Sequence, residues 1–119
     1  QVISFSGGAP KTSSQNEIFI PTVQVNSFHL APPTHDPLDY DASELNRTMQ
    51  LANVMVGSFN FKGKMRISTQ TDFGTSLDVM RASWASVYDV EITNPFLPQF
   101  NLQVPMLLVN PSHVIFGLV

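Results

Sequence analysis

Strict alternation of apolar and polar residues over positions 58–70 constrains the fold of this chain more than any other feature. One side of the stretch carries large apolar residues, which are Phe59, Phe61, Met65 and Ile67. The other side is wholly polar and includes the basic residues Lys62, Lys64 and Arg66. Successive side chains of a β-strand point to opposite faces, so the pattern predicts a half-buried strand with a polar outer face.

Gly63 leaves two interpretations of this stretch open. A hairpin that turns at residues 62–63 would place Phe61 beside Lys64, which mixes apolar and charged side chains on one face. We therefore favour one continuous strand over about residues 56–71, with Gly63 at a bulge or bend.

Further strand-type segments flank this strand on both sides. They cover residues 17–30, 86–93, 100–108 and 114–119, and turns with proline or Asn-Pro separate most of them. Within 86–93, alternation predicts that Tyr88 and Val90 face inward and that Val87 faces outward. Many strands with such connections predict an all-β fold, an antiparallel β-sandwich or roll of jelly-roll-like form with one or two short helices.

Two capping signals predict the short helices. A capping box at residues 41–44, followed by apolar residues at helical spacing, predicts a helix over about residues 42–53. A second capping box at residues 75–78 predicts a helix near residues 76–84, with Trp84 in the core.

The chain divides into an arm and a single domain. A length of 119 residues suits one domain, and we place it at residues 17–119 as a β-rich unit. Residues 1–16 have a linker composition and predict an N-terminal arm that its own domain or an adjacent subunit holds in place. Because Gln1 is not an initiator Met and no signal-peptide pattern follows it, we expect a processed or trimmed product or part of a longer protein.

Charge is scarce in this chain, and the scarcity predicts assembly. Charged residues make up 13% of the sequence, about half of the usual ~25% in soluble domains. Charge normally keeps a small domain soluble and monomeric, so we expect neighbours to cover part of this surface. A monomer with a neutral polar surface is the alternative. The net charge of −3 argues against a general binder of polyanions.

The last segment, residues 114–119, is apolar on both faces, so we expect it to be central in the sheet or covered by a partner. The predicted assembly contacts are Ile115, Phe116, Leu118 and Val119. The expected partners are copies of the chain or other subunits of an assembly.

Lys62, Lys64 and Arg66 form an electrostatic stripe on the polar face of the long strand. Their spacing of about 6.6 Å suits phosphate, sulfate or an acidic partner surface. The alternative is pairing across the sheet with Asp89 and Glu91, which show the same two-residue step. Nucleic acid is not an expected partner, because the aromatic residues lie on the opposite face.

The acidic loop at residues 35–44 offers one candidate metal site. Asp36, Asp39 and Asp41 would supply oxygen ligands to Ca²⁺. Their spacing is not that of an EF-hand, and helix capping is the simpler interpretation. We therefore predict no cofactor.

No catalytic or membrane-spanning motif stands out. The histidines are isolated, and neither a nucleophile elbow nor a phosphate-binding loop occurs, so we predict that the chain is not an enzyme. A hydrolase with a Ser, His and Asp group assembled across space is the least favoured alternative. No apolar run reaches the ~18–20 residues that span a bilayer, so no membrane span is expected.

Residues 90–98, with the sequence VEITNPFLP, resemble the strand, Asn-Pro and turn segment of plant late-embryogenesis WHy-type β-sandwiches. This resemblance covers a short part of the chain and implies no function. In overall character the chain is similar to virion structural and decoration proteins, because it is small, free of cysteine, poor in charge, rich in strand patterns and fitted with a polar arm.

These features together predict a non-enzymatic structural subunit of a larger assembly. We expect a virion capsid, decoration or tail-type protein with a virion or extracellular location. The alternative is an extracellular β-sandwich module that binds a glycan or another ligand through loops near residues 31–41 and 94–98.

Overall fold

The fold is mostly antiparallel β-structure with one α-helix among the residues that the structure describes. The computed structural model describes residues 2–4, 11–29, 45–80 and 84–119. The strands are β1 Val2–Ser4, β2 Lys11–Ser13, β3 Ser27–Phe28, β4 Arg47–Val56, β5 Phe59–Ser68, β6 Ala85–Thr93, β7 Asn101–Val109 and β8 Ile115–Leu118. The helices are the 3-10 turn η1 at Thr22–Gln24 and the α-helix α1 at Phe73–Met80.

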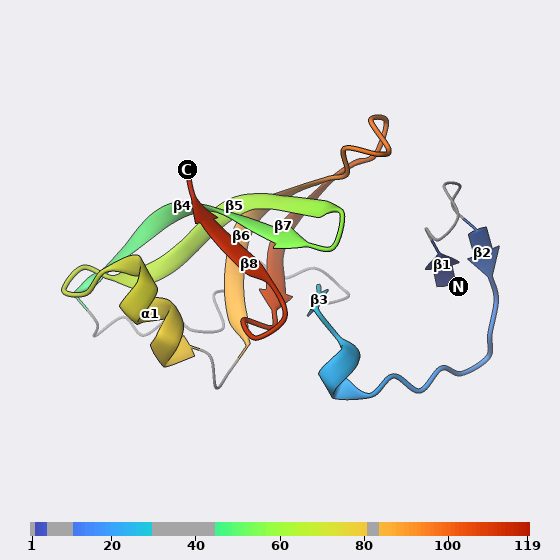
Figure 1. Cartoon of the computed structure of the whole chain (residues 1–119), viewed down its shortest axis with the longest axis horizontal. Coiled ribbons are helices and arrows are strands. Elements are labelled where there is room, and N and C mark those ends of the chain that lie inside the picture. The colour runs from blue at the N-terminus through green and yellow to red at the C-terminus, as the bar shows by residue number, and fades with distance from the viewer. Residues whose placement is uncertain (1, 5–10, 30–44, 81–83) are drawn as a thin grey trace.

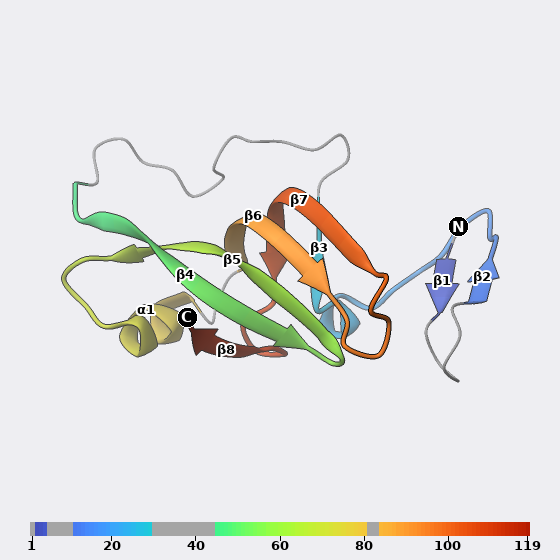
Figure 2. The ribbon, with the colours of Figure 1, turned by 90° about the horizontal axis from the view of Figure 1, so that it is seen from above.

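Six strands form one curled sheet in the order β3-β7-β6-β5-β4-β8, in which all neighbours are antiparallel. The sheet bends into a half-barrel, as Figure 1 and Figure 2 show. The short link at residues 110–114 carries the chain from β7 to β8 on the far side of β4. The all-β expectation is confirmed in this form. The described strands include no second sheet stacked on the first, so a sandwich or jelly-roll stays a prediction.

The helix predicted over residues 42–53 is wrong where the structure describes it, because β4 occupies most of that range. A two-residue turn at residues 57–58 joins β4 to β5, and the φ of +59° at Gly57 is typical of a type II′ turn. The resulting hairpin pairs β4 with β5 over their whole length. Pairing with a complete neighbouring strand outweighs the local helical spacing. Residues 42–44 lie outside the described part of the chain.

The prediction of one continuous strand is confirmed by β5, which runs through Gly63 without a turn. Its bounds are narrower than expected, because the turn at residues 57–58 precedes it. The irregularity expected at Gly63 is also present, since the register against β6 shifts between Lys62 and Lys64. The extra residue of this bulge lies in β6, where Asp89 has a left-handed φ of 52°.

The bulge changes which side chains of β6 face the core. Val87 and Val90 both belong to the buried core, although simple alternation would place them on opposite faces. The prediction that Val87 faces outward is therefore wrong. Tyr88 shares a face with its register partner Lys64 rather than with Val90, and it is buried there.

α1 begins earlier than the helix predicted near residues 76–84. Its N-cap is Asp72, whose Oδ1 accepts a hydrogen bond from the backbone N–H of Thr75 at 2.8 Å. This hydrogen bond is the main cause that lowers the pKa of Asp72 below its ordinary value. Trp84 lies beyond the helix, and its ring contacts that of Phe28 with centroids 5.0 Å apart.

The hydrophobic core lies on one face of the sheet, which we call the inner face. Its largest fully buried side chains come from strands β4 to β7 and are Val54, Met65, Val87, Val90 and Val109. Phe73 and Leu77 of α1 pack against this core. The opposite face of the sheet is called the outer face below.

The N-terminal hairpin stands apart from this core. β1 and β2 pair with each other in a separate two-stranded sheet. Figure 1 shows this hairpin away from the half-barrel and joined to it by an extended segment. Every residue from 11 to 24 is exposed, so the exposed stretch continues beyond the predicted end of the arm at residue 16. The division between arm and domain stays a prediction.

Candidate functional site

The electrostatic stripe lies on the outer face of β5, beside an acidic row on β6. The Lys64 ammonium is 3.3 Å from a carboxylate oxygen of Asp89, and Lys62 is the register partner of Glu91. The cross-strand alternative is thus found for Lys64, and an exposed pair of this kind contributes at most about 1 kcal/mol. A role for Lys62, Lys64 and Arg66 in binding an anion or an acidic partner stays a prediction.

A second stripe on the outer face is apolar and runs along β4 and β8. We call it the outer apolar strip and define it by Met49, Leu51, Met55 and Ile115, whose exposed fractions lie between 44% and 65%. Met55 and Ile115 are register partners on these two strands. Exposed apolar surface of this kind marks contact sites on small domains. The strip was not predicted, because Met49 and Leu51 were assigned to a helix over residues 42–53.

β8 is the outermost strand on its side of the sheet and pairs there with β4. The expectation of a central position for residues 114–119 is therefore wrong. The successive pairing of β4, β5, β6 and β7 fills the middle of the sheet, and β8 is added outside β4. The predicted assembly contacts Ile115, Leu118 and Val119 are 65%, 59% and 58% exposed.

Phe116 differs from the other predicted assembly contacts. Its ring lies edge to face with that of Phe73 in α1, with centroids 6.3 Å apart, and it packs against the core. Phe116 therefore anchors β8 to its own domain. Whether any of the four residues contacts a partner stays a prediction.

The β4–β5 turn fixes the direction of the backbone groups of β4. In a two-residue hairpin the closing pair, here Val56 and Phe59, is hydrogen-bonded, and successive residues of the strand then point to opposite neighbours. Val56 and Val54 therefore direct their backbone groups to β5. Asn53 and Met55 direct theirs to β8.

The same alternation fixes the free edge of β8. Gly117 and Ile115 are the register partners of the β4 residues that point toward β8, so their backbone groups face β4. The N–H and C=O groups of Phe116 and Leu118 consequently face away from the sheet. No described strand pairs with this edge.

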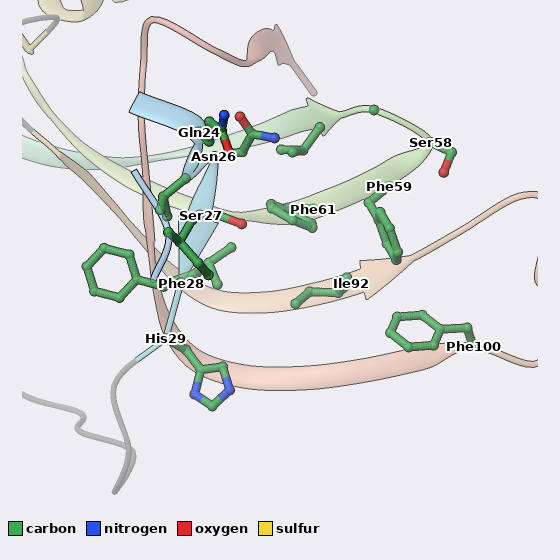
Figure 3. A pocket seen from close by; sticks show the side chains of 15 residues that line it. Gln24, Asn26, Ser27, Phe28, His29, Ser58, Phe59, Phe61, Ile92 and Phe100 are labelled. Atoms are coloured by element: carbon green, nitrogen blue, oxygen red, sulfur yellow. The ribbon is translucent and has the colours of Figure 1, made fainter. Parts of the chain in front are cut away.

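A groove of about 680 Å³ opens on the inner face between the sheet and residues 20–29. Figure 3 shows the aromatic side chains of Phe59, Phe61 and Phe100 in its lining. The rings of Phe59 and Phe100 meet edge to face with centroids 5.7 Å apart. His29 is the one titratable side chain among the described lining residues. The aromatic lining of the groove therefore suits binding of apolar groups.

A second hollow, of about 530 Å³, lies beside the turn that follows β6. Phe96, 80% exposed, stands at its wall. The buried side chain of Asn94 holds this turn, because its amide donates to the Ser58 hydroxyl at 3.1 Å and its oxygen accepts from the Phe96 N–H at 2.9 Å. Asn53 also lines the hollow, and its buried Oδ1 has no hydrogen-bond donor among the described residues.

The predicted calcium ligands Asp36, Asp39 and Asp41 lie outside the described residues. Within the described part of the chain, no three His, Cys, Asp or Glu side chains gather in a way that could hold a metal ion. No helix in this part is long and apolar enough to cross a membrane.

A sequence signal for the missed outer surface was present. Gly57-Ser58 stands between two runs that can alternate as strands, and a Gly-Ser pair in this position is typical of a type II′ hairpin. If residues 47–56 are taken as the strand that pairs with β5, the β4 part of the outer apolar strip falls beside the electrostatic stripe. The bulge at Asp89 carries no comparable local signal.

Comparison with known proteins adds no relative to this description. No family model, curated protein or solved structure matches the chain. The candidate surfaces are therefore judged on their own geometry and chemistry.

Proposed function

We propose that this chain is a non-enzymatic structural subunit of a larger assembly, of the virion capsid, decoration or tail type, with a virion or extracellular location. Its partners would be copies of itself or other subunits. In such an assembly a neighbouring subunit would cover the half-barrel and complete the two-layered β-sandwich or roll that the sequence predicts.

The single observation that carries this proposal is an exposed apolar segment at residues 18–20, just after the predicted arm. Ile18, Phe19 and Ile20 are 56%, 88% and 59% exposed, and they follow a hairpin that stands away from the half-barrel (Figure 1). Burying side chains of this size is worth about 1.5–3 kcal/mol each. A segment that leaves these side chains exposed on its own domain is suited to contact with a neighbour.

The surface chemistry of the sheet supports the same proposal. The outer apolar strip and the exposed side chains of β8 adjoin each other through Ile115. With charged residues at 13% of the sequence, little charge is available to keep such surfaces apart. Exposed apolar surface is therefore present at residues 18–20 and at the β4–β8 side of the sheet.

Sedimentation velocity of the full chain from low to high micromolar concentration tests the proposal. We expect oligomers that dissociate on dilution, and we expect deletion of residues 1–16 or the substitution Phe19→Ser to weaken them. Val79→Ser is the matched control, because Val79 is 78% exposed on α1 and away from the arm. A monomer at every concentration, unchanged by the deletion, would contradict the proposal.

A second candidate, glycan binding, is favoured by the hollow beside Phe96. An exposed aromatic ring next to the amide groups of Asn53 and Asn60 offers a stacking surface and hydrogen-bonding groups for a sugar. Glycan-array binding that disappears in Phe96→Ala, with an unchanged melting temperature, would support this candidate. An array without hits would argue against it.

A further inference from the structure

We propose that β8 pairs edge to edge with β8 of a second copy, antiparallel and about a two-fold axis at Gly117. The pairing would join two six-stranded sheets into one continuous sheet. This inference rests on the proposed function, because it names the contact by which two subunits would associate.

No described strand pairs with the outward edge of β8, so this edge is open to such pairing. The N–H and C=O groups of Phe116 and Leu118 face away from β4, as derived above from the register. Residues 114–119 contain no charged residue and no proline, which are the usual devices that prevent edge pairing. The nearest proline, Pro111, lies outside the strand.

The opposite edge of the sheet is protected. β3 pairs with β7 only at Leu108 and Val109, and the rest of β7 carries Pro105, which has no N–H to donate. Asn101 and Gln103 of β7 are also polar and exposed. Sheet extension is therefore expected at β8 and not at β7.

The sequence of β8 is self-complementary about Gly117. Pairing Gly117 with itself brings Ile115 opposite Val119 and Phe116 opposite Leu118 of the second copy, and each of these pairs is formed twice. Shifting the register by two residues would instead place Gly117 opposite Ile115 or Val119. The register centred on Gly117 thus gives apolar cross-strand pairs at every position except the axis.

Charge does not oppose the pairing. The electrostatic stripe lies on β5, and β4 and β8 separate it from the proposed two-fold axis. The stripes of two paired copies would be five strand spacings apart, about 24 Å. This separation exceeds the ~8 Å Debye length at physiological ionic strength, so their repulsion would be screened.

Cysteine trapping tests the register directly, because the chain contains no cysteine. A Cβ at Gly117 would meet nothing within 4 Å, so Gly117→Cys fits the subunit. In the proposed register, Gly117 faces its own copy in a non-hydrogen-bonded pair, with Cα atoms about 4.5 Å apart, which suits a disulfide. We expect covalent dimers of Gly117→Cys under mild oxidation.

Ile115→Cys is the matched control for the trapping experiment. The two copies of residue 115 would be separated by four residues along the strand, about 13 Å, which is too far for a disulfide. We expect this variant to stay reduced. Equal cross-linking of both variants, or cross-linking of Ile115→Cys alone, would overturn the inference.

Leu118→Pro tests the hydrogen bonds without cysteine chemistry. Proline removes the outward N–H, and Leu118→Ala removes the same side-chain contacts but keeps that N–H. We expect the dissociation constant of the dimer to be about tenfold or more higher for proline than for alanine, because two equivalent hydrogen bonds are lost. Circular dichroism would confirm that both variants are folded.

The outcomes separate this inference from the proposed function. Oligomers that persist in Leu118→Pro, together with no disulfide in Gly117→Cys, would overturn pairing through β8 and leave the structural-subunit proposal standing. A chain that is monomeric at every concentration would overturn both.

Discussion

Two glycines of the same sheet show how different its centre and its edge are. A Cβ at Gly63 would lie 2.8 Å from Val87 Cγ1 and 2.9 Å from the Tyr88 carbonyl oxygen, whereas a Cβ at Gly117 would meet nothing. Gly63 is needed because the bulge of β6 brings backbone close to β5. Gly117 lies in a strand that has a neighbour on one side only.

This difference indicates which part of the molecule is complete. The centre of the sheet is packed by its own side chains, with Val54, Met65 and Val87 fully buried. The edge leaves Ile115 and Leu118 largely exposed and backbone groups unpaired by any described strand. Stability should therefore reside in the centre, and contact with partners should reside at the edge.

The largest expected effect compares two methionines, one at the centre and one on the outer apolar strip. Met65 is 1% exposed and Met55 is 44% exposed. We expect Met65→Ala to lower the free energy of unfolding by about 2–5 kcal/mol, because it leaves a cavity. Met55→Ala should change it by less than about 0.5 kcal/mol. Urea denaturation of both variants measures the two changes in the free energy of unfolding. Similar losses for both would contradict the expected difference between the centre of the sheet and the outer apolar strip.

The glycines themselves give the next effect. Gly63→Ala should destabilise the fold by about 2 kcal/mol, since the new Cβ meets buried Val87 and a backbone carbonyl that cannot move freely. Gly117→Ala should leave the stability unchanged or raise it by less than about 1 kcal/mol, through the reduced freedom of the unfolded chain. Thermal denaturation at low protein concentration measures both. A tolerated Gly63→Ala would show that the bulge does not hold β5 and β6 closely.

A smaller effect is expected for the ion pair that crosses the bulge. Lys64 and Asp89 are 46% and 70% exposed in their side chains, so water screens their attraction. A double-mutant cycle with Lys64→Ala and Asp89→Ala should give a coupling free energy below about 1 kcal/mol that decreases with added salt. A coupling free energy well above ~1 kcal/mol that does not change with salt would contradict the expectation that water screens this ion pair.

The smallest effect concerns Asp72 at the start of α1. Because its pKa is lowered in the folded state, its carboxylate stabilises the fold above its ordinary pKa, and this contribution is lost as the pH falls through the folded value. The difference in Tm between the wild type and Asp72→Ala should be a few degrees or less at neutral pH and should shrink in acid. The difference in Tm between Asp72→Asn, which keeps an acceptor that does not titrate, and Asp72→Ala should not depend on pH in this way. A pH-independent difference for Asp72→Ala would contradict the proposed cap.

The sequence was sufficient for β5 and for parts of the candidate surfaces. Alternation is a local property, so the two faces of β5 and the stripe of Lys62, Lys64 and Arg66 could be assigned from it. The special position of Gly63 was predictable for the same reason, since a glycine within a strand pattern marks a bulge or a close approach.

The helix predicted over residues 42–53 shows where local signals fail. Met49 and Ala52, which are at helical spacing, lie on opposite faces of β4, with Met49 48% exposed and Ala52 buried. Only the neighbouring strand decides between helix and strand here. The outer apolar strip could not be placed until this choice was made. The free edge of β8 was equally hidden, because an apolar strand reads the same at the centre and at the border of a sheet.

Local patterns were enough to show that this protein is built from strands, that β5 has one apolar and one basic face, and that charge is scarce. Three further features become visible only in the folded chain: Val87 and Val90 share the core, β8 lies at an edge, and the N-terminal hairpin stands away from the half-barrel. The physical reason is that alternation needs only neighbouring residues, whereas a bulge, a strand order and an exposed edge depend on pairing between distant segments.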